Sequence, residues 1–278
     1  MSALCFSVLL SLYHKENFLA LDQCFQSIWK DQTIQPDEII LVLDGPIGEE
    51  LSQCVQKWQR IIGKSLRVIP LSQNIGLGMA LNEGLKHCSH DWVFRMDTDD
   101  ICVEKRFEYQ LQFIKNNPNI VLFGGQILEF DKNVNDANKL KPVPQEYSDI
   151  LSFSKKRNPF NHMTVAYKKS IILSLQGYQH HLFMEDYNLW LRVISKGYEV
   201  ANLSQILVYA RVGNGMHARR RGSEYIKSEK QLLDLKIALK TESLISAYVT
   251  FILRSFFRFL PSNLLGFVYN NLLRKKPK

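Results

Sequence analysis

Residues 92–100 read Trp-Val-Phe-Arg-Met-Asp-Thr-Asp-Asp, a mostly apolar run that ends in three carboxylates. A short apolar run followed by polar residues is typical of a strand covered on both faces. At the end of such a strand, Asp97 and Asp99 can direct two carboxylates at one ligand. Carboxylate oxygens suit Mg²⁺ or Mn²⁺, which bridge to phosphate oxygens. The segment therefore predicts either a metal-assisted phosphate site or, on its own, a solvated acidic turn.

The sequence before this strand alternates between two patterns. Apolar runs that predict strands cover residues 4–12, 39–43 and 66–71. Between them, apolar residues recur at steps of three or four, which predicts helices near 18–28, 51–62 and 77–85. This alternation favours a doubly wound α/β sheet with ligands outside the carboxyl ends of its strands.

The remainder of the chain is less regular. We expect a helix ending near Asn116, strands over 121–130, 164–167 and 206–209, a polar loop over 131–144, and a helix from Glu185. A polar helix over 222–240 should precede two apolar helices, 244–260 and 264–273, and a basic end, 274–278. The tail therefore differs in character from the α/β part.

Length and composition limit the class of protein. The 278 residues suit one large domain or one domain with an appendage. A net charge of +8 favours anionic partners such as nucleotides, nucleic acid or acidic lipid, although a slightly basic soluble protein has the same balance. Five cysteines without a Cys-x-x-Cys pair predict reduced thiols in the cytosol and no zinc site.

The start of the chain does not read as a targeting segment. The apolar stretch 4–12 lacks a basic leader and a small-residue cleavage site, and it is short for a membrane span. A buried first strand explains it better, so we expect a cytoplasmic protein.

Two further segments follow predicted strands. Asp44, in Asp44-Gly45-Pro46, could accept hydrogen bonds from a base or ribose, or could simply form a turn. In the segment 74–78, Asn-Ile-Gly-Leu-Gly, Gly76 would let the backbone approach a ligand, and Asn74 could cap a helix. The third glycine of a dinucleotide-binding fingerprint is missing.

Three candidates lie later in the chain. Glu185-Asp186 opens a predicted helix and contains a candidate general base, although acids at a helix start also interact favourably with its dipole. His162 precedes a strand and has either a catalytic or a structural role. The basic run 211–221, with Arg211 and His217, could contact diphosphate or acidic lipid, or form a solvated face.

Together these segments resemble the family-2 glycosyltransferases with the GT-A fold, especially bacterial enzymes that build O-antigen, capsule or exopolysaccharide. The resemblance covers about residues 5–225 and depends on the order and spacing of the segments. The matching segments are 6–13 with Glu16, 32–46, 74–77 with Asn82 and Gly84, 95–100 with Arg106 and Gln110, and 185–192.

The resemblance implies a role for each matching residue. It implies a nucleotide-sugar site formed by Tyr13, Glu16, Asp44, Gly76, Arg95, Asp97 and Asp99, with Asp97 and Asp99 holding Mn²⁺ or Mg²⁺. Asp186 would be the general base. His162, Glu185, Arg211 and His217 would contact acceptor or diphosphate.

The resemblance also implies a reaction and a domain plan. A metal-bound nucleoside diphosphate is a good leaving group, so one base suffices and the anomeric carbon should be inverted. By family frequency the donor is UDP-Glc or UDP-Gal. The GT-A domain would span 1–222, with a nucleotide half over 1–100 and an acceptor half over 101–222, and a helical segment would span 223–278.

The tail suggests where the acceptor is. Arg254 and Arg258 lie four residues apart, which suits a helix lying in a membrane interface better than one crossing it. The basic end would favour anionic lipid. We therefore expect a peripheral protein on the inner face of the cell membrane and an undecaprenyl-diphosphate-linked saccharide as acceptor. Alternatively, the helices pack back on the catalytic domain.

Three other functions remain as alternatives. A polyprenyl-phosphate sugar synthase shares the fold but needs no hydroxyl base. A sugar-phosphate nucleotidyltransferase should carry a glycine-rich basic loop near the first strand, where residues 11–14 read Ser-Leu-Tyr-His. A nucleic-acid-binding protein fits the charge, but no recognisable module is present, so we expect no nucleic acid partner.

Overall fold

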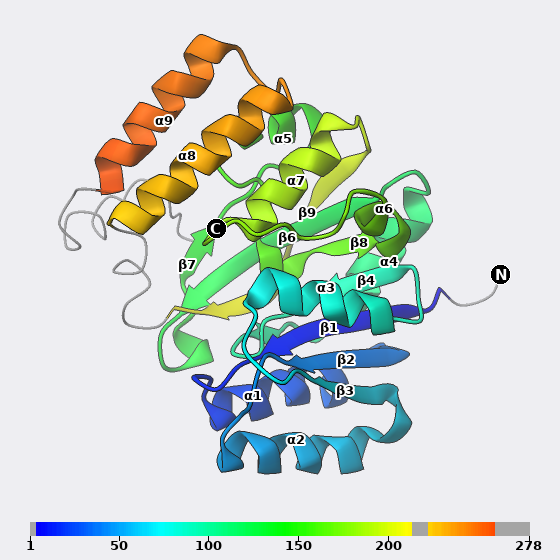
Figure 1. Cartoon of the computed structure of the whole chain (residues 1–278). Coiled ribbons are helices and arrows are strands. Elements are labelled where there is room, and N and C mark those ends of the chain that lie inside the picture. The colour runs from blue at the N-terminus through cyan, green and yellow to red at the C-terminus, as the bar shows by residue number, and fades with distance from the viewer. Residues whose placement is uncertain (1–3, 213–221, 259–278) are drawn as a thin grey trace.

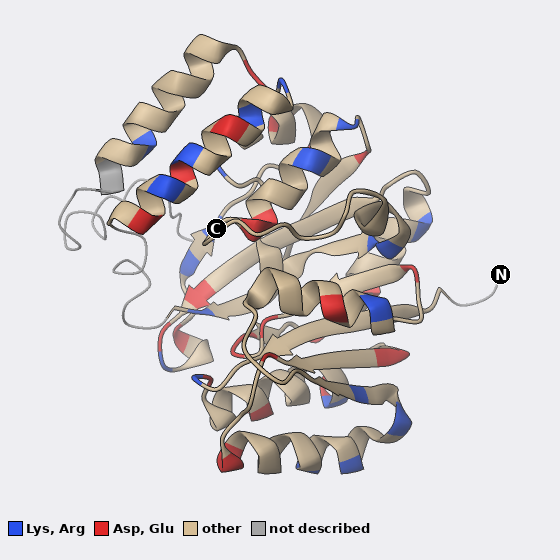
Figure 2. Cartoon of the chain, viewed as in Figure 1, with Lys and Arg blue, Asp and Glu red and all other residues tan. Residues whose placement is uncertain are grey.

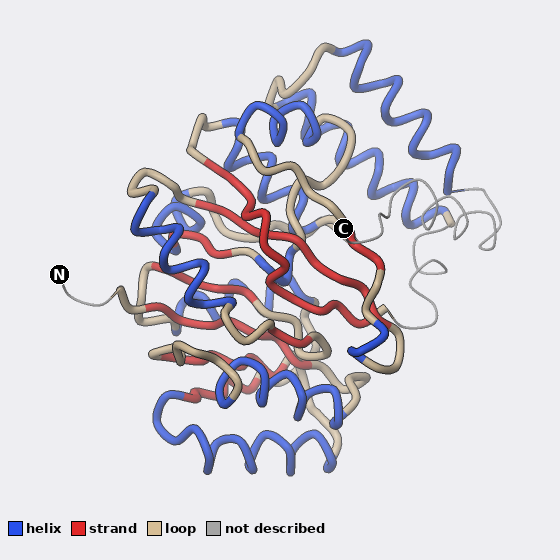
Figure 3. The backbone as a smooth tube through the Cα atoms, turned by 180° about the vertical axis from the view of Figure 1, so that it is seen from behind, coloured by secondary structure: helices blue, strands red, loops and turns tan. Residues whose placement is uncertain are grey.

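A nine-stranded sheet with helices on both faces forms the centre of the computed structural model, which describes residues 4–212 and 222–258 (Figures 1 and 3). The sheet order is β3-β2-β1-β4-β8-β6-β9-β5, with β7 paired to β6. This architecture confirms the α/β class expected from the sequence.

The first half of the sheet is parallel. Its strands are β1 (Phe6–Leu12), β2 (Glu38–Leu43), β3 (Leu66–Pro70) and β4 (Trp92–Arg95). The connecting helices are α1 (Phe18–Phe25), which continues as a π-helical turn (Gln26–Lys30), α2 (Glu49–Ile62) and α3 (Leu77–His87). Because these strands run in the same direction, the residues that follow them gather at one edge.

The second half mixes directions. Its strands are β5 (Ile101–Cys102), β6 (Leu122–Phe130), β7 (Lys139–Lys141), β8 (Ala166–Lys168) and β9 (Val200–Arg211). Its helices are α4 (Arg106–Asn116), α5 (Tyr147–Ser154), α6 (Lys169–Ser174) and α7 (Glu185–Ser195). Strand β8 is antiparallel to both β4 and β6, so β6 and β9 again end at the edge where β1, β2 and β4 end.

Alternating side chains of β1 form two cores. Val8 and Leu10 pack with residues of α1, α2 and α4, whereas Leu9 packs on the other face with residues of α3 and α7. Gly84 lets α3 come close to the sheet, because a Cβ atom there would lie 2.4 Å from Leu9 Cδ1. Close packing of this kind leaves little room for α3 to shift.

The predicted strands and long helices of the described residues are present, but the two-residue strand β5 was not predicted, and the segment 131–144 is not simply a loop. It contains β7, a short strand that pairs with β6. Strand β9 begins at Val200, well before the expected residue 206, and its pairing with β6 shifts register between Gly124 and Ile127. The short helices α5 and α6 were not predicted, because six to eight residues give little periodicity.

The described tail forms a helical hairpin, α8 (Ser223–Ala238) and α9 (Leu244–Arg258), which we call the C-terminal hairpin. Helix α8 packs against α7, and α9 lies on the outer side of α8 (Figure 1). The expected helix over 264–273 and the basic end over 274–278 lie outside the described residues.

Arg254, one of the two arginines whose spacing suggested a helix lying in a membrane interface, points into the protein. Its guanidinium turns inward and pairs with the Glu229 carboxylate, with Nε 2.6 Å from Oε2 and Nη2 3.0 Å from Oε1. It also donates to the carbonyl of Lys156, at 2.9 Å. Glu229 is 2% exposed, and Arg254 supplies a counter-charge for its buried carboxylate. The side chain of Arg258 lies outside the described residues.

Two further observations concern the described chain. In residues 4–212 and 222–258, no helix combines the length and the apolar character that crossing a bilayer requires. All five cysteines are free thiols, and four of them are buried, in agreement with the expected reduced state.

Candidate active site

The candidate site lies at the edge where β1, β2 and β4 end. Backbone hydrogen bonds hold these ends together: the amide of Asp44 donates to the carbonyl of Leu12 at 2.7 Å, and that of Met96 donates to Leu9 at 3.1 Å. Tyr13 and Glu16 follow β1 in a turn in which the Glu16 amide donates to the Tyr13 carbonyl at 3.1 Å. The structure thus brings Tyr13, Asp44 and Asp97 to one edge, as the sequence predicts.

Asp44 organises the loop before α3. Its Oδ1 accepts from the amide of Ile75 at 2.7 Å, and its Oδ2 accepts from the amide of Gly76 at 3.1 Å and from Asn74 Nδ2 at 2.9 Å. Gly45 is required beside it, because φ is +88° and a Cβ atom would lie 2.7 Å from Asn74 N. Asp44 therefore fixes the loop, and its contact with a base or ribose remains a prediction.

Arg95 lies beneath the acidic segment. The side chain is 1% exposed and forms an ion pair with Asp97 Oδ1. Arg106, which is fully buried, donates from Nη2 to the Arg95 carbonyl at 2.6 Å. Arg95 is thereby fixed at both its backbone and its side chain.

The carboxylates of the acidic segment are crowded. Burial, and then the charge of Asp97, raises the pKa of Asp99 to about 6. Burial, together with Asp99, raises the pKa of Asp100 well above its usual range. Among the described residues, Asp100 Oδ2 is buried and has no hydrogen-bond partner. Such a cluster disfavours a further negative charge unless a cation joins it.

The acidic segment fits a divalent cation that also binds substrate. Asp97 and Asp99 supply hard oxygen ligands, and the raised pKa of Asp99 reflects a charge that a cation would offset. No group of three or more metal-ligating side chains occurs within the described parts of the chain. Mg²⁺-type sites with one or two carboxylates take their remaining oxygens from phosphates and water.

Arg211 braces the same segment from β9. Its backbone amide donates to Asp100 Oδ1 at 2.7 Å, and its Nε donates to the Asp99 carbonyl at 3.0 Å. The guanidinium also donates to Gln23 Oε1 at 2.7 Å and lies over the ring of Phe130. The expected diphosphate contacts over 215–220, including His217, lie outside the described residues.

The second pair of acids opens α7. Asp186 Oδ2 accepts from Asn158 Nδ2 at 2.6 Å, and Oδ1 accepts from the amide of Tyr187 at 2.7 Å. Burial raises the pKa of Asp186, and these two hydrogen bonds oppose the shift. Burial, and then the charge of Asp186, raises the pKa of Glu185 to about 7. A carboxylate with a raised pKa is a better base near neutral pH.

His162 lies beside Tyr178 and Trp190. Its Nε2 is 2.9 Å from the hydroxyl of Tyr178, and its ring packs against Trp190. Burial, and then the charge of Arg95, lowers the pKa of His162 well below its usual range. His162 is therefore neutral at physiological pH and has a structural partner in this state.

Arg95 connects the two halves of the site electrostatically. Its charge lowers the pKa of Asp99 on one side and those of Glu185 and Asp186 on the other. The structure thus brings the Asp97–Asp99 pair and the Glu185–Asp186 pair around one buried cation. Asn158 was not predicted as a partner of Asp186, because an Asn before a Pro indicates only a turn.

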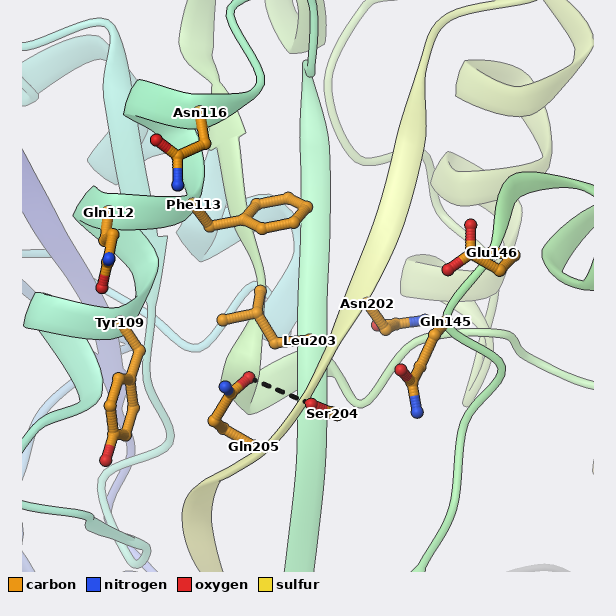
Figure 4. Close-up of a pocket in the computed structure, with 10 residues that line it drawn as sticks. All are labelled: Tyr109, Gln112, Phe113, Asn116, Gln145, Glu146, Asn202, Leu203, Ser204 and Gln205. Carbon is orange, nitrogen blue, oxygen red and sulfur yellow. Dashed lines mark hydrogen bonds between the residues drawn. The ribbon is translucent and has the colours of Figure 1, made fainter.

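A separate groove of about 380 Å³ runs between α4 and the first part of β9 (Figure 4). Its wall residues are mostly amides and rings, with Glu146 as the one charged side chain: Tyr109, Gln112, Phe113, Asn116, Gln145, Glu146, Asn202, Leu203, Ser204 and Gln205. It contains none of the acidic pairs, and with one acid and no base in its walls it does not suit a nucleotide diphosphate.

The fold defines an α/β protein with a ligand site at the carboxyl ends of its strands. Residues 7–181 match the family model for "Glycosyl transferase family 2". The chain therefore belongs to glycosyltransferase family 2 and is a glycosyltransferase, as its resemblance to that family implied.

Three curated relatives match nearly the whole chain. An uncharacterized glycosyltransferase of Haemophilus influenzae is 51% identical over 97% of this chain and 99% of its own. The amylovoran biosynthesis glycosyltransferase AmsE of Erwinia amylovora is 46% identical over 95% and 97%. An Escherichia coli protein named UDP-Gal:alpha-D-GlcNAc-diphosphoundecaprenol beta-1,3-galactosyltransferase is 37% identical over 97% of each chain.

Solved structures confirm the GT-A fold. TarS of S. aureus in complex with UDP-GlcNAc has a TM-score of 0.67 at 17% identity, over 91% of this chain and 73% of TarS. The mannosyltransferase PcManGT of Pyrobaculum calidifontis, in complex with GDP-Man and Mn²⁺, has a TM-score of 0.64 at 16% identity, over 95% and 78%.

Proposed function

We propose that this chain is an inverting hexosyltransferase of bacterial surface polysaccharide synthesis. It would move a hexose from UDP-Glc or UDP-Gal to a hydroxyl of an undecaprenyl-diphosphate-linked saccharide. One observation carries the proposal: two acidic pairs, Asp97–Asp99 and Glu185–Asp186, face one buried arginine, Arg95. One pair suits a metal-bound donor and the other suits a base for the acceptor.

The donor would bind at the ends of β1, β2 and β4. Tyr13, Glu16, Asp44, Gly76 and Arg95 would contact the nucleotide sugar. Asp97 and Asp99 would hold Mn²⁺ or Mg²⁺, which supplies compensation for the negative charge of the leaving diphosphate when it is bound. The complex of PcManGT with GDP-Man and Mn²⁺ supports this arrangement.

The chemical step would be a single displacement with Asp186 as general base. Asp186 takes the proton of the acceptor hydroxyl, and the hydroxyl oxygen forms a bond to the anomeric carbon. The bond from that carbon to the diphosphate oxygen breaks, and its electron pair leaves with the nucleoside diphosphate. Attack opposite the leaving group inverts the configuration.

The acceptor side would use the residues around Asp186. Glu185, His162, Arg211 and His217 would contact the acceptor or the diphosphate. The E. coli relative, whose name gives a GlcNAc-diphosphoundecaprenol acceptor and a β-1,3 linkage made from UDP-Gal, supports both the lipid-linked acceptor and inversion.

The domain plan places the acceptor beside a membrane. Residues 1–222 would form the catalytic domain, and residues 223–278 a helical segment that binds the inner face of the cell membrane. Support comes from α9, which carries few charges beside the strongly charged α8 (Figure 2). Its exposed large side chains form one stripe: Leu244, Ile245, Tyr248, Val249, Ile252, Leu253 and Phe256. Such a stripe suits the interface between lipid head groups and chains.

The test is a transfer assay with a panel of nucleotide sugars, Mn²⁺ or Mg²⁺, and a synthetic GlcNAc-diphosphate-lipid acceptor. We expect metal-dependent nucleotide release that is lost in Asp99→Ala and in Asp186→Ala. Glu199→Ala, which removes an exposed carboxylate at the start of β9, should retain activity. Full activity of Asp186→Ala would favour a phosphate acceptor, which needs no base.

The stereochemistry is tested on the same product. Proton NMR of the glycosidic linkage should show an anomeric configuration opposite to that of the donor. A retained configuration would contradict the single displacement.

A further inference from the structure

Asn158 has one fixed orientation beside Asp186. Its Nδ2 donates to Asp186 Oδ2 at 2.6 Å, and its Oδ1 accepts from the amide of Phe160 at 3.2 Å. An exchange of the two amide atoms would place an oxygen against the carboxylate and a nitrogen against an N–H group. Asn158 is therefore a donor to Asp186 in any arrangement that satisfies both partners.

The segment that carries Asn158 is rigid. The carbonyl of Pro159 accepts from Asn202 Nδ2 at 3.0 Å, and Asn161 Nδ2 donates to the carbonyl of Gly125 at 3.0 Å. Phe160 is 1% exposed and packs edge-on against Trp190 of α7. The position of the Asn158 amide is thus fixed by β6 and β9 as well as by α7.

The two oxygens of Asp186 have different surroundings. Oδ1 accepts from the amide of Tyr187 in its own helix, so that bond follows any movement of α7. Oδ2 is held by Asn158, which lies outside the helix. The bond from Asn158 is therefore the one that fixes the carboxylate relative to the sheet.

A hydrogen-bond donor without charge, such as the Asn158 amide, suits the proposed role of Asp186 as a base. The charged and titratable groups that face Asp186 are Glu185, Arg95 of β4, Lys141 of β7, Tyr178 and Tyr187. A third cation at position 158 would stabilise the ionised carboxylate further and weaken it as a base. An amide holds the carboxylate in place without adding a charge.

We propose that Asn158 is a positioning residue that orients the Asp186 carboxylate toward the acceptor hydroxyl. The inference rests on the proposed role of Asp186 as general base. It assigns to Asn158 alone, among the residues of the segment 158–162, a part in the reaction.

The experiment compares the pH profile of kcat for transfer in the unchanged protein, Asn158→Ala, Asn158→Asp and Asn161→Ala. Asn158→Ala should lower kcat roughly 10- to 100-fold and leave KM for the nucleotide sugar nearly unchanged. Asn158→Asp places a second carboxyl against Asp186, which should raise the pKa of Asp186. The acid limb of the kcat profile, where activity falls at low pH, should therefore move to higher pH by about one unit or more.

Asn161→Ala is the matched control. Asn161 lies in the same segment and is fully buried, but it binds the carbonyls of Gly125 and Lys141 rather than Asp186. Its replacement should leave the acid limb unmoved. An NMR titration of ¹³C-labelled aspartate carboxyls should show an upward shift in the pKa of Asp186 in both Asn158 variants, larger in Asn158→Asp because of the added like charge.

The possible outcomes distinguish a failure of the positioning role of Asn158 from a failure of the proposed transferase function. A folded Asn158→Asp variant with an unmoved limb, or equal limb shifts in the Asn158 and Asn161 variants, would overturn the positioning role and leave the transferase intact. A wild-type chain that transfers no sugar to any acceptor would overturn the proposed function and this inference together.

Discussion

Gly78 lies so close to Glu185 that a Cβ atom on Gly78 would be 3.2 Å from the Cβ atom of Glu185. The same atom would be 3.3 Å from Tyr178 Cβ. The first turn of α3, which follows the loop held by Asp44, therefore packs directly on the first turn of α7. Through this contact the loop held by Asp44 and the first turn of α7 keep a fixed separation.

Gly78→Ala should destabilise the protein by about 1 kcal/mol. The new methyl group would crowd the Cβ atoms of Glu185 and Tyr178, which lowers the free energy of unfolding by about 1–3 kcal/mol. Replacing a glycine within a helix by alanine raises it by about 1 kcal/mol. Urea unfolding measures the difference. A stability gain would mean that α3 and α7 separate freely and that the contact does not fix their spacing.

Asp44→Ala should weaken both the fold and nucleotide binding. The loop amides of Ile75 and Gly76 lose their acceptor, which costs about 2 kcal/mol in the free energy of unfolding. The affinity for UDP, measured by calorimetry, should fall as the loop loses its fixed position. If stability falls and UDP affinity stays the same, the loop over 74–76 is not part of the nucleotide site.

Glu185→Gln should stabilise the protein above pH 7. The folded-state pKa of Glu185 is raised to about 7, so the unfolded chain ionises first and stability falls as the pH rises from about 4 through 7. Glutamine does not ionise, so the variant does not lose stability in this way as the pH rises. The free energy of unfolding of the variant should exceed that of the unchanged protein by up to about 3 kcal/mol at pH 8 and converge with it near pH 4.

Urea titrations at several pH values give the comparison for Glu185. A constant difference across the pH range would show that the substitution acts through packing rather than through ionisation.

Charges on the outer face of α9 should weaken membrane binding. Ile245 and Ile252 are 80% and 62% exposed, so glutamate at these positions should not disturb the fold but should oppose insertion into an interface. Flotation with anionic liposomes should recover less of the double variant Ile245→Glu/Ile252→Glu. Gln56→Glu, which adds a charge on α2 at the opposite end of the molecule, is the control. Equal recovery of all forms would count against a membrane-binding role for α9.

Arg254→Ala should loosen the C-terminal hairpin. Glu229 is 2% exposed, so the loss of its bidentate partner leaves a buried carboxylate, at a cost of about 3 kcal/mol or more. Hydrogen exchange in α9 should become faster. The double replacement Arg254→Met/Glu229→Met should recover much of the protection, because no charge is left unpaired. Fast exchange in the double variant as well would mean that the ion pair itself holds the hairpin.

Most of the fold could be predicted from the sequence, because most of its strands are uninterrupted apolar runs. Residues 39–42 and 92–94 are buried on both faces, and Asp44 and Asp97 come after these strands at the same edge, as a parallel sheet requires. The strands that were predicted poorly, β7 and the start of β9, are set by pairing with β6 rather than by local pattern. Pairing of this kind is a tertiary property.

The partners of the site residues could not be read from the sequence. Spacing predicted that Glu185 and Asp186 begin a helix. The contact between Asn158 and Asp186 joins residues 28 positions apart in the sequence, and no periodic pattern predicts such a contact. Arg254 illustrates the opposite case. Its spacing from Arg258 suggested a helix lying in a membrane interface, whereas the buried Glu229 of α8 explains why its side chain points inward.

Tyr187 connects the C-terminal hairpin to the candidate active site, in addition to the membrane binding proposed for the hairpin. It follows Asp186 directly, and the cations of Lys236 in α8 and Arg254 in α9 lie over its ring. A chimaera that carries the tail of another transferase would therefore need matching cations at these two places. Exchange of tails would alter the cation contacts of Tyr187, the neighbour of the proposed base Asp186, so we expect the hairpin and the α/β part to require joint engineering.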